Sequence, residues 1–90
     1  MTCGAILTLT GQLSAESALP WIHHRGQLLN LAGWVRREDD QTIRMALAGP
    51  EPLIEAMEIA CSLGPGDVLV DTITRARHTF DEKPDTFVML

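Results

Sequence analysis

Tyrosine is absent from this chain, and the other large aromatic residues are few. Trp21, Trp34, Phe80 and Phe87 are the only tryptophans and phenylalanines among 90 residues. A hydrophobic fraction of 46% with 21% charged residues is ordinary for a globular domain, which argues against intrinsic disorder. We therefore expect a folded domain whose core is built from aliphatic side chains.

Lysine and arginine are also scarce. Seven such residues stand against twelve aspartates and glutamates, which gives a formal net charge of −5. Nucleic acids and anionic membranes both favour a basic surface, so we expect neither as a partner. The basic residues that do cluster are Arg36, Arg37 and Arg44, which form a local positive region in an acidic chain.

Cysteines and long hydrophobic runs are also few. Cys3 and Cys61 are the only two cysteines, and no run reaches the roughly 20 apolar residues of a membrane-spanning helix. The first 24 residues contain no lysine or arginine and no compact apolar block, so they do not indicate a secretory signal. We expect two free thiols in a reducing compartment, and hence a cytoplasmic location.

Metal-binding patterns are missing too. His23 and His24 are adjacent, and adjacent side chains on a helix point about 100° apart, so the pair cannot chelate one metal. Neither a C-x-x-C nor an H-x-x-x-H spacing occurs. We expect no metal and no cofactor, and we expect both histidines on the outer surface of a helix.

Hydropathy periodicity predicts alternating strands and helices. Strands are predicted over 5–10, 31–36, 42–48, 68–77 and 87–90. Helices are predicted over 20–30 and 51–63, the second ended by Gly64-Pro65-Gly66. The order β-α-β-β-α-β plus a terminal strand predicts an α+β, ferredoxin-like βαββαβ sandwich. Its two helices would cover one face of an antiparallel four- to five-stranded sheet. Residues 1–90 are expected to form a single domain.

Several apolar side chains can be assigned to a place in this fold. Leu19, Ile22, Gly26 and Leu29 have helical spacing and are predicted to form the inner face of the first helix. Trp34 is interpreted as a structural residue, and Trp21 as an exposed residue that is a candidate for contact with a ligand or partner. The methionines on apolar faces are predicted to lie in the core: Met45, Met57 and Met89.

One motif points beyond the fold. Leu31-Ala32-Gly33-Trp34-Val35-Arg36 follows Gly11 at an interval that resembles, without a gap, the spacing found in acylphosphatases. That family carries Gly-x-Val-Gln-Gly-Val-Gly-Phe-Arg after its first strand and Leu-x-Gly-Trp-Val-Arg-Asn later. Gly64-Pro65 and Phe87-Val88 fall where the family has a Gly-Pro and a closing strand. The resemblance covers nearly the whole chain and implies the acylphosphatase-like fold.

The same resemblance implies which residues occupy the family's chemical positions. The phosphate-binding arginine falls on Leu19, the catalytic asparagine falls on Arg37, and the loop Gly-Val-Gly-Phe falls on Ala15-Glu16-Ser17-Ala18. Leucine donates no hydrogen bond, and an arginine can donate to an anion but cannot accept from water. Glu16 adds a negative charge where a phosphate would sit. We therefore predict a catalytically inactive member that acts as a binding or interaction module.

The predicted binding surface is the Gly11–Trp21 loop together with Arg37, and it includes the 12–19 connector. No catalytic residue is assigned, and the candidate ligand-binding residues are Gln12, Ser14, Ala15, Glu16, Ser17, Ala18 and Arg37. Ser14 and Ser17 are otherwise expected to be loop and helix-cap residues. The partner would be an anionic small molecule or a protein, and exposed strand edges would also permit a homodimer.

An alternative interpretation retains the enzyme. Arg37, with Arg36 or Arg25, would replace the missing arginine from the other side of the pocket. Gln12 would orient water for the hydrolysis of acyl phosphates. The simplest interpretation assigns no ligand to Arg36 and Arg37, which would be solvated charges beside three acidic residues: Glu38, Asp39 and Asp40.

Overall fold

The structure is a computed structural model that describes residues 2–64, 66 and 68–90. Its elements in chain order are β1 (Thr2–Gln12), α1 (Ala18–Leu28), β2 (Ala32–Asp39), β3 (Thr42–Pro50), α2 (Glu51–Leu63), β4 (Leu69–Arg77) and β5 (Phe87–Met89). The predicted order is confirmed, and α2 has the predicted bounds. Helix α1 begins and ends two residues earlier than predicted, and β1 extends beyond its predicted segment at both ends. Within the described ranges, no helix is long and apolar enough to cross a membrane.

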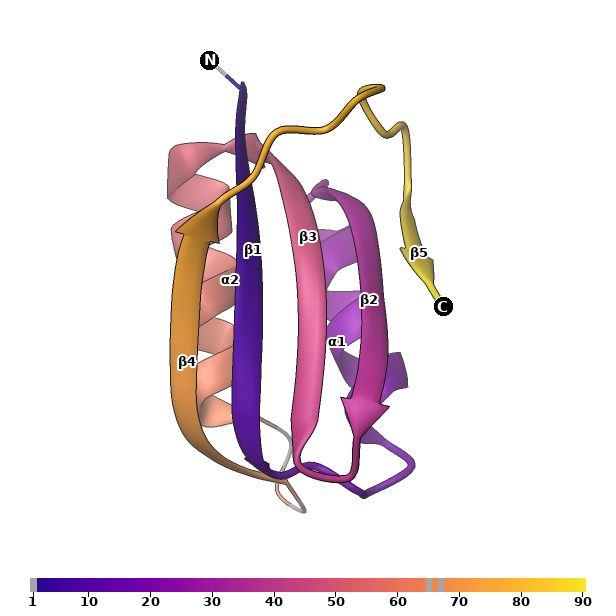
Figure 1. The fold of residues 1–90 in the computed structure, drawn as a ribbon, viewed down its shortest axis with the longest axis vertical. Coiled ribbons are helices and arrows are strands. Elements are labelled where there is room, and N and C mark those ends of the chain that lie inside the picture. The colour runs from indigo at the N-terminus through magenta and orange to yellow at the C-terminus, as the bar shows by residue number, and fades with distance from the viewer. Residues whose placement is uncertain (1, 65, 67) are drawn as a thin grey trace.

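The five strands form one sheet in the order β4-β1-β3-β2-β5 (Figure 1). Strand β1 pairs antiparallel with both β3 and β4, and β2 pairs antiparallel with β3. Strand β5 lies parallel to β2, so the sheet is mixed and the prediction of an antiparallel sheet is wrong at this edge. Both helices cover the same face of the sheet, as predicted for the ferredoxin-like sandwich.

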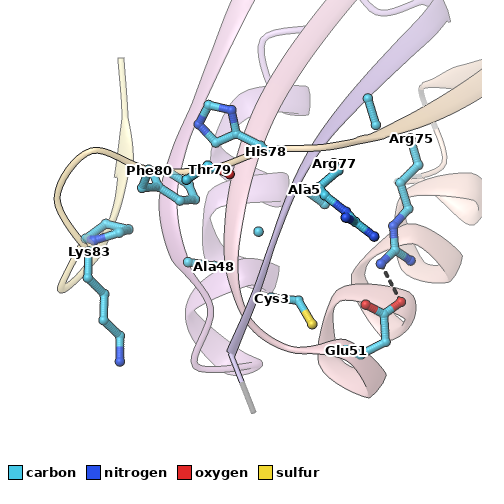
Figure 2. Close-up of a pocket in the computed structure, with 13 residues that line it drawn as sticks. Cys3, Ala5, Ala48, Glu51, Arg75, Arg77, His78, Thr79, Phe80 and Lys83 are labelled. Carbon is cyan, nitrogen blue, oxygen red and sulfur yellow. Dashed lines mark hydrogen bonds and ion pairs between the residues drawn. The ribbon is translucent and has the colours of Figure 1, made fainter.

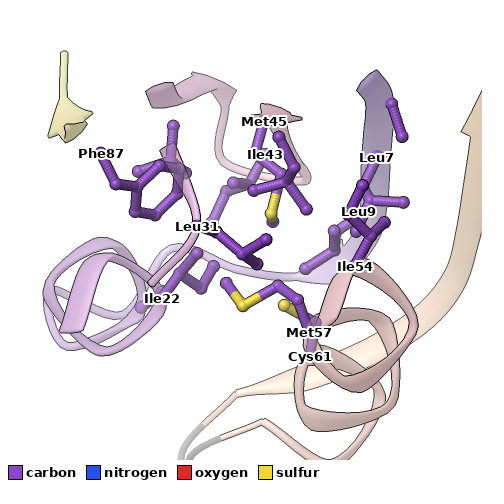
Figure 3. Packing of buried hydrophobic residues seen from close by; sticks show 14 of the residues in the cluster. Leu7, Leu9, Ile22, Leu31, Ile43, Met45, Ile54, Met57, Cys61 and Phe87 are labelled. Atoms are coloured by element: carbon purple, nitrogen blue, oxygen red, sulfur yellow. The ribbon is translucent and has the colours of Figure 1, made fainter. Parts of the chain in front are cut away.

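The core lies between that face and the two helices (Figure 3). Alternate residues of β1 and β3 point into it, which is why Leu7, Leu9 and Ile43 are fully buried beneath the helices. Helix α2 supplies Ile54, Met57 and Cys61 at helical spacing, so the second helix contributes one continuous apolar stripe. Burying an aliphatic side chain of this size stabilises the fold by about 1.5–3 kcal/mol. As predicted, the core is mainly aliphatic.

A bulge displaces the pairing of β1 with β4. Thr10 pairs with Thr72, but Gly11 pairs with Val70, so one residue of β4 is left over. Gly11 has a φ of 151°, and a Cβ there would collide with the backbone of Leu69. A strict alternation would place Val70 and Ile73 on opposite faces, yet both pack against the core.

Strand β5 is fastened to α1 by two side chains. The Phe87 ring packs against Gly26, where a Cβ would overlap the ring, so glycine allows the close approach of this helix to β5. The His23 ring stacks on Phe87, and its Nε2 lies 2.7 Å from the Phe87 carbonyl oxygen. The prediction that His23 lies on the outer surface is therefore wrong, whereas His24 is exposed.

The other predictions of buried positions are also partly confirmed and partly wrong. Ile22 and Gly26 are buried, and Leu19 and Leu29 pack against the core. Met89 is exposed, so its assignment to the core is wrong; the other two methionines named above are buried. Gly64 ends α2 with a φ of 60°, and Pro65 of the predicted stop lies outside the described residues.

The two cysteines differ in burial, which gives a testable difference in reactivity. Both are free, Cys3 is half-buried, and burial raises the pKa of the Cys61 thiol to about 12. Only thiolates alkylate rapidly, so Cys61 stays protonated and inert at pH 8. We expect iodoacetamide to label the native chain at Cys3 alone, measured by peptide mass spectrometry. Labelling of Cys61 should appear only in denaturant, and comparable native labelling of both residues would contradict this assignment.

Candidate functional site

The predicted binding surface lies at one end of the sheet. Here β1 leaves the sheet, residues 13–17 form a short connector, α1 begins, and β2 ends close by (Figure 1). The connector is tied to the turn between β2 and β3, because the Leu13 N–H donates to the Asp40 carbonyl at 3.2 Å. The Gly11 N–H likewise donates to the carbonyl of Gln41 at 3.0 Å. The fold therefore brings the connector and the end of β2 together, as the resemblance implied.

Arg37 is the charged side chain that reaches this connector. Along β2, Val35 points into the core, so Arg36 points away and Arg37 points to the helix side. The Arg37 guanidinium donates through Nη1 to the Leu13 carbonyl and through Nη2, at 3.1 Å, to the Ala15 carbonyl. Both contacts are partly buried. The interpretation of Arg37 as a solvated charge beside acidic residues is therefore wrong.

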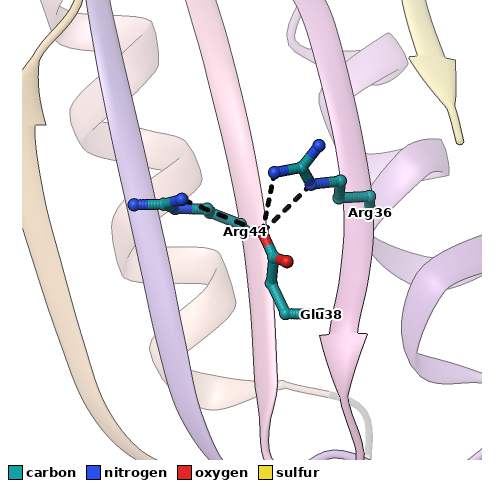
Figure 4. Close-up of polar contacts among 3 residues, drawn as sticks. All are labelled: Arg36, Glu38 and Arg44. Carbon is teal, nitrogen blue, oxygen red and sulfur yellow. Dashed lines mark hydrogen bonds and ion pairs between the residues drawn. The ribbon is translucent and has the colours of Figure 1, made fainter.

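Arg36 lies on the other face of the sheet, where it contacts an acidic side chain instead of the connector (Figure 4). Its Nε and Nη2 both lie 3.0 Å from the Glu38 carboxylate, and Arg44 approaches the same oxygen at 3.9 Å. The Arg36 guanidinium also stacks 5.0 Å from the centre of the half-buried Trp34 ring. Because the two arginine side chains are 44% and 48% exposed, this cluster contributes little stability, about 0–1 kcal/mol per pair. Arg36 lies on the face opposite the connector and does not assist Arg37 there.

The remaining candidate residues are placed by the connector and the first turn of α1. Gln12 ends β1 and is exposed, as are Ser14, Glu16 and Ser17; Ser17 is the residue at the N-cap position. Ala15 is half-buried, and its carbonyl accepts from the Ala18 N–H at 3.1 Å as well as from Arg37. Ala18 is buried.

Leu19, at the position that would hold the phosphate-binding arginine, packs against the core from the first turn of α1. The connector therefore contains a cation from β2 but no cation from α1. Arg25, also considered as a helper, lies two turns further along α1, with its guanidinium 5.3 Å from the centre of the half-buried Trp21 ring.

The electrostatics of the site are mixed. A helix N-terminus carries a partial positive charge, and the first turn of α1 holds no acidic residue that would offset it. Glu16 on the connector and Asp39 and Asp40 in the adjacent turn add negative charge, although the Asp39 carboxylate is engaged by the Gln41 N–H at 2.8 Å. Arg37 is thus the group best placed to hold an anion here. Among the residues that the structure describes, no group of three histidines, cysteines or acidic residues could hold a metal ion.

A depression of about 810 Å³ lies at the opposite end of the sheet (Figure 2). Two of its charged side chains are paired with each other: Arg75 contacts Glu51, and the Arg75 guanidinium holds the pKa of Glu51 below its ordinary value. Arg75 also lies 3.6 Å from Glu58. Figure 2 shows Lys83 pointing away from this pair. Sequence reasoning missed the Arg75 contacts. The parity of β4 indicates them, because Arg75 is two residues from the inward-facing Ile73.

The chain is similar to known proteins over most of its length. The family model for acylphosphatase matches residues 10–89. An acylphosphatase of Acidiphilium cryptum is 37% identical over 78 residues, which cover 87% of this chain and 82% of that protein. An acylphosphatase of Rhodospirillum rubrum is 35% identical over 68 residues, or 76% of this chain and 75% of that protein. The crystal structure of acylphosphatase from Bacillus subtilis has a TM-score of 0.90 at 20% identity, covering 100% of this chain and 99% of that chain.

Proposed function

The chain belongs to the acylphosphatase family, and we propose that it hydrolyses the carboxyl–phosphate bond of acyl phosphates through a rearranged site centred on Arg37. The observation that carries this proposal is the position of the Arg37 guanidinium against the Leu13 and Ala15 carbonyls. The resemblance implies that the family's phosphate loop corresponds to this connector. A cation is therefore present at the expected end of the fold, although it comes from β2 instead of α1.

The guanidinium has the chemistry that phosphate binding requires. It presents five N–H donors in a planar fork that can hold two oxygens of one phosphoryl group. Two of those donors now contact backbone carbonyls. An incoming phosphoryl group would take over the Nη donors, and a dianion is a stronger partner for them than a neutral carbonyl. Arg37 would thus bind the substrate and stabilise charge on the phosphoryl oxygens during transfer.

The reaction also needs an oriented water. The water oxygen forms a bond to phosphorus, the bond from phosphorus to the carboxyl oxygen breaks, and the carboxylate leaves while the water proton passes to phosphate or solvent. Arg37 cannot accept a hydrogen bond from that water. Gln12 carries an amide with both an acceptor and donors, and it is exposed at the start of the connector. We assign the water-orienting role to Gln12.

A second candidate function is binding without turnover. The observation that favours it is Leu19, which offers no donor where the resemblance implies the family's arginine. Loss of one such charge-stabilising group typically lowers the rate by about 10²–10³. A module that holds an anionic small molecule or a protein at the connector would keep the fold and need no oriented water.

Substitution of Arg37 by alanine tests the proposed function. We expect Arg37→Ala to lower kcat/KM for benzoyl phosphate by at least about 100-fold, because it removes the only cation described at the connector. Arg36→Ala is the matched control: it removes the neighbouring arginine from the opposite face and should stay within about twofold of the unmodified chain. Circular dichroism would establish that both variants are folded.

The two candidate functions predict different results in the same assay. Turnover of the unmodified chain that disappears in Arg37→Ala supports the hydrolase. No turnover, with phosphate shifting the amide resonances of residues 13–17 and 37, supports the binding module. Turnover that persists in the Arg37→Ala variant would contradict the proposed role of Arg37 in binding the phosphoryl group.

A further inference from the structure

Strand β4 forms one edge of the sheet, and β1 is its only neighbour among the strands that the structure describes (Figure 1). It is nine residues long, against three in β5 at the other edge. The His78 N–H donates to the Gly4 carbonyl at 3.1 Å, so at this residue the backbone groups point toward β1. These groups alternate in direction along an antiparallel strand, so those of Ile73, Arg75 and Arg77 point away from β1. Strand β4 therefore has peptide donors and acceptors that β1 leaves available to an added strand.

A groove of about 530 Å³ lies beside this edge, between β4 and α2. Its apolar lining comes from Val70 and Ile73 of β4 and from Ile59 of α2, which is 60% exposed. Ile73 packs against the core, so its side chain is on the side of the sheet that the helices cover. A strand added to β4 would continue the sheet and point every second side chain to that same side. Those side chains would meet the groove that β4 and α2 form.

The groove is acidic. The charged residues that line it are Glu55, Glu58, Asp71 and Arg75. Arg75 is already engaged by Glu51 and lies 3.6 Å from Glu58, so its charge is offset within the chain. Glu55 and Asp71 are exposed, and neither forms an ion pair among the described residues. A second copy of this chain would bring the same carboxylates to the edge, so a basic partner is the more complementary occupant.

We propose that β4 and α2 bind an extended, basic segment of a partner protein, which joins the sheet as a strand beside β4. Its groove-facing residues would be a lysine or arginine, an aliphatic residue, and another lysine or arginine. Main-chain hydrogen bonds to β4 would hold the segment, and the groove would select its side chains. The aliphatic side chain would pack against Val70, Ile73 and Ile59, and the cations would face Glu55 and Asp71.

The proposed contact is separate from the proposed hydrolysis. Arg37 lies on β2, and both β1 and β3 stand between β2 and β4 in the sheet. Peptide binding at β4 therefore does not require an active site at the connector, and either proposal can fail without the other.

A designed peptide tests the proposal on the whole chain. The probe is acetylated and amidated, and it alternates four threonines with lysine, valine and lysine, so that the lysines and the valine share one face. We expect saturable binding by calorimetry and shifts of the backbone amide resonances of residues 70–77. Amide hydrogen exchange should slow at Ile73, Arg75 and Arg77, because their N–H groups gain acceptors.

Variants of the chain test the charge complementarity. Replacing both free carboxylates, Glu55→Gln with Asp71→Asn, should weaken binding of the peptide about tenfold, the effect of losing two exposed ion pairs. Asp81→Asn with Glu82→Gln is the matched control, because it removes the same charge from exposed residues that do not line the groove. That variant should bind within about twofold of the unmodified chain.

Two altered peptides test the mode of binding without changing the protein. Glutamates in place of both lysines should abolish binding, and so should N-methyl groups on the amides that would face β4. The proposal is overturned if the original peptide does not bind, or if either altered peptide binds as well as the original. It is also overturned if the two double variants lose affinity equally, or if sedimentation shows a second copy of the chain already paired at β4.

Discussion

Replacing Leu19 with arginine and Arg37 with asparagine is expected to raise kcat/KM for benzoyl phosphate by at least about 100-fold over the unmodified chain. The resemblance assigns phosphate binding to an arginine at position 19 and water orientation to an asparagine at position 37. Each such group typically contributes about 10²–10³ in rate. The double variant reinstates both in a backbone that has the family's fold.

The geometry explains why the two changes must be made together. Leu19 is in the first turn of α1, beside the connector that Arg37 now holds through the Leu13 and Ala15 carbonyls. An arginine at 19 alone would bring a second guanidinium beside the first, and the two would repel each other. An asparagine at 37 alone would remove the cation that the connector has. Only the pair gives one cation and one amide with an acceptor for water.

Both single variants serve as controls for the double variant. We expect each to stay below it by at least about tenfold, and thermal melts should show how much stability the half-buried Leu19 contributed. Further substitutions, Ala15→Gly and Ser17→Gly, should add to the gain by restoring the freedom of the loop backbone. A double variant no faster than the unmodified chain would mean that the arrangement around Arg37 is as effective as the family's own, or that the register of the connector is wrong.

Periodicity along the sequence was sufficient to predict the helices and strands. It was not sufficient to predict how the strands pair at the edges of the sheet. The apolar stripes of β1, β3 and α2 fixed the core because each has one buried face with a regular period. The parallel position of β5 depends on Phe87 meeting Gly26 and His23 of α1, which lie more than sixty residues earlier in the sequence. The bulge beside Gly11 likewise depends on contact with β4. Such tertiary contacts leave no local periodic signal.

The location of the candidate site could be predicted from the sequence, but the contacts of Arg37 within it could not. The resemblance grouped the connector and Arg37 into one predicted surface, and the two are in contact. The contacts of Arg37 were missed because its neighbours in sequence are acidic and suggested surface ion pairs. Strand parity carried the missing information: Val35 is buried, so Arg37 shares its side of the sheet while Arg36 does not. Which carbonyls the guanidinium meets depends on the path of the connector, which no periodicity describes.

Replacing Gly33 with alanine should destabilise the fold by at least about 3 kcal/mol, a large share of the 5–15 kcal/mol typical of small domains. Gly33 has a φ of 131°, a region that side chains rarely permit. A Cβ there would lie on the Ala46 carbonyl oxygen and 2.8 Å from the Ala46 carbonyl carbon. Both obstacles are backbone, so neither can move aside as a flexible side chain would.

The position of Gly33 in the sheet determines how far this damage spreads. It lies in β2 between β3 and β5, opposite Leu47 on one side and Phe87 on the other, and its N–H donates to the Thr86 carbonyl at 2.9 Å. Separating β2 from β3 to admit a methyl group would break ladder hydrogen bonds and loosen the attachment of β5. It would also shift Arg37, four residues along the same strand, so Gly33→Ala should weaken hydrolysis as well as folding.

Urea denaturation followed by circular dichroism measures the loss, with Gly66→Ala as the matched control. A Cβ at Gly66 meets no atom within 4 Å, so that variant should stay within about 0.5 kcal/mol of the unmodified chain. A loss below about 1 kcal/mol in Gly33→Ala would show that β2 and β3 can separate cheaply. The sheet would then not require glycine at position 33, and the glycine of the Gly33-Trp34-Val35-Arg36 motif would have to be explained by a role in the reaction. The expected larger loss makes it a requirement of the sheet, one that an active and an inactive member would share.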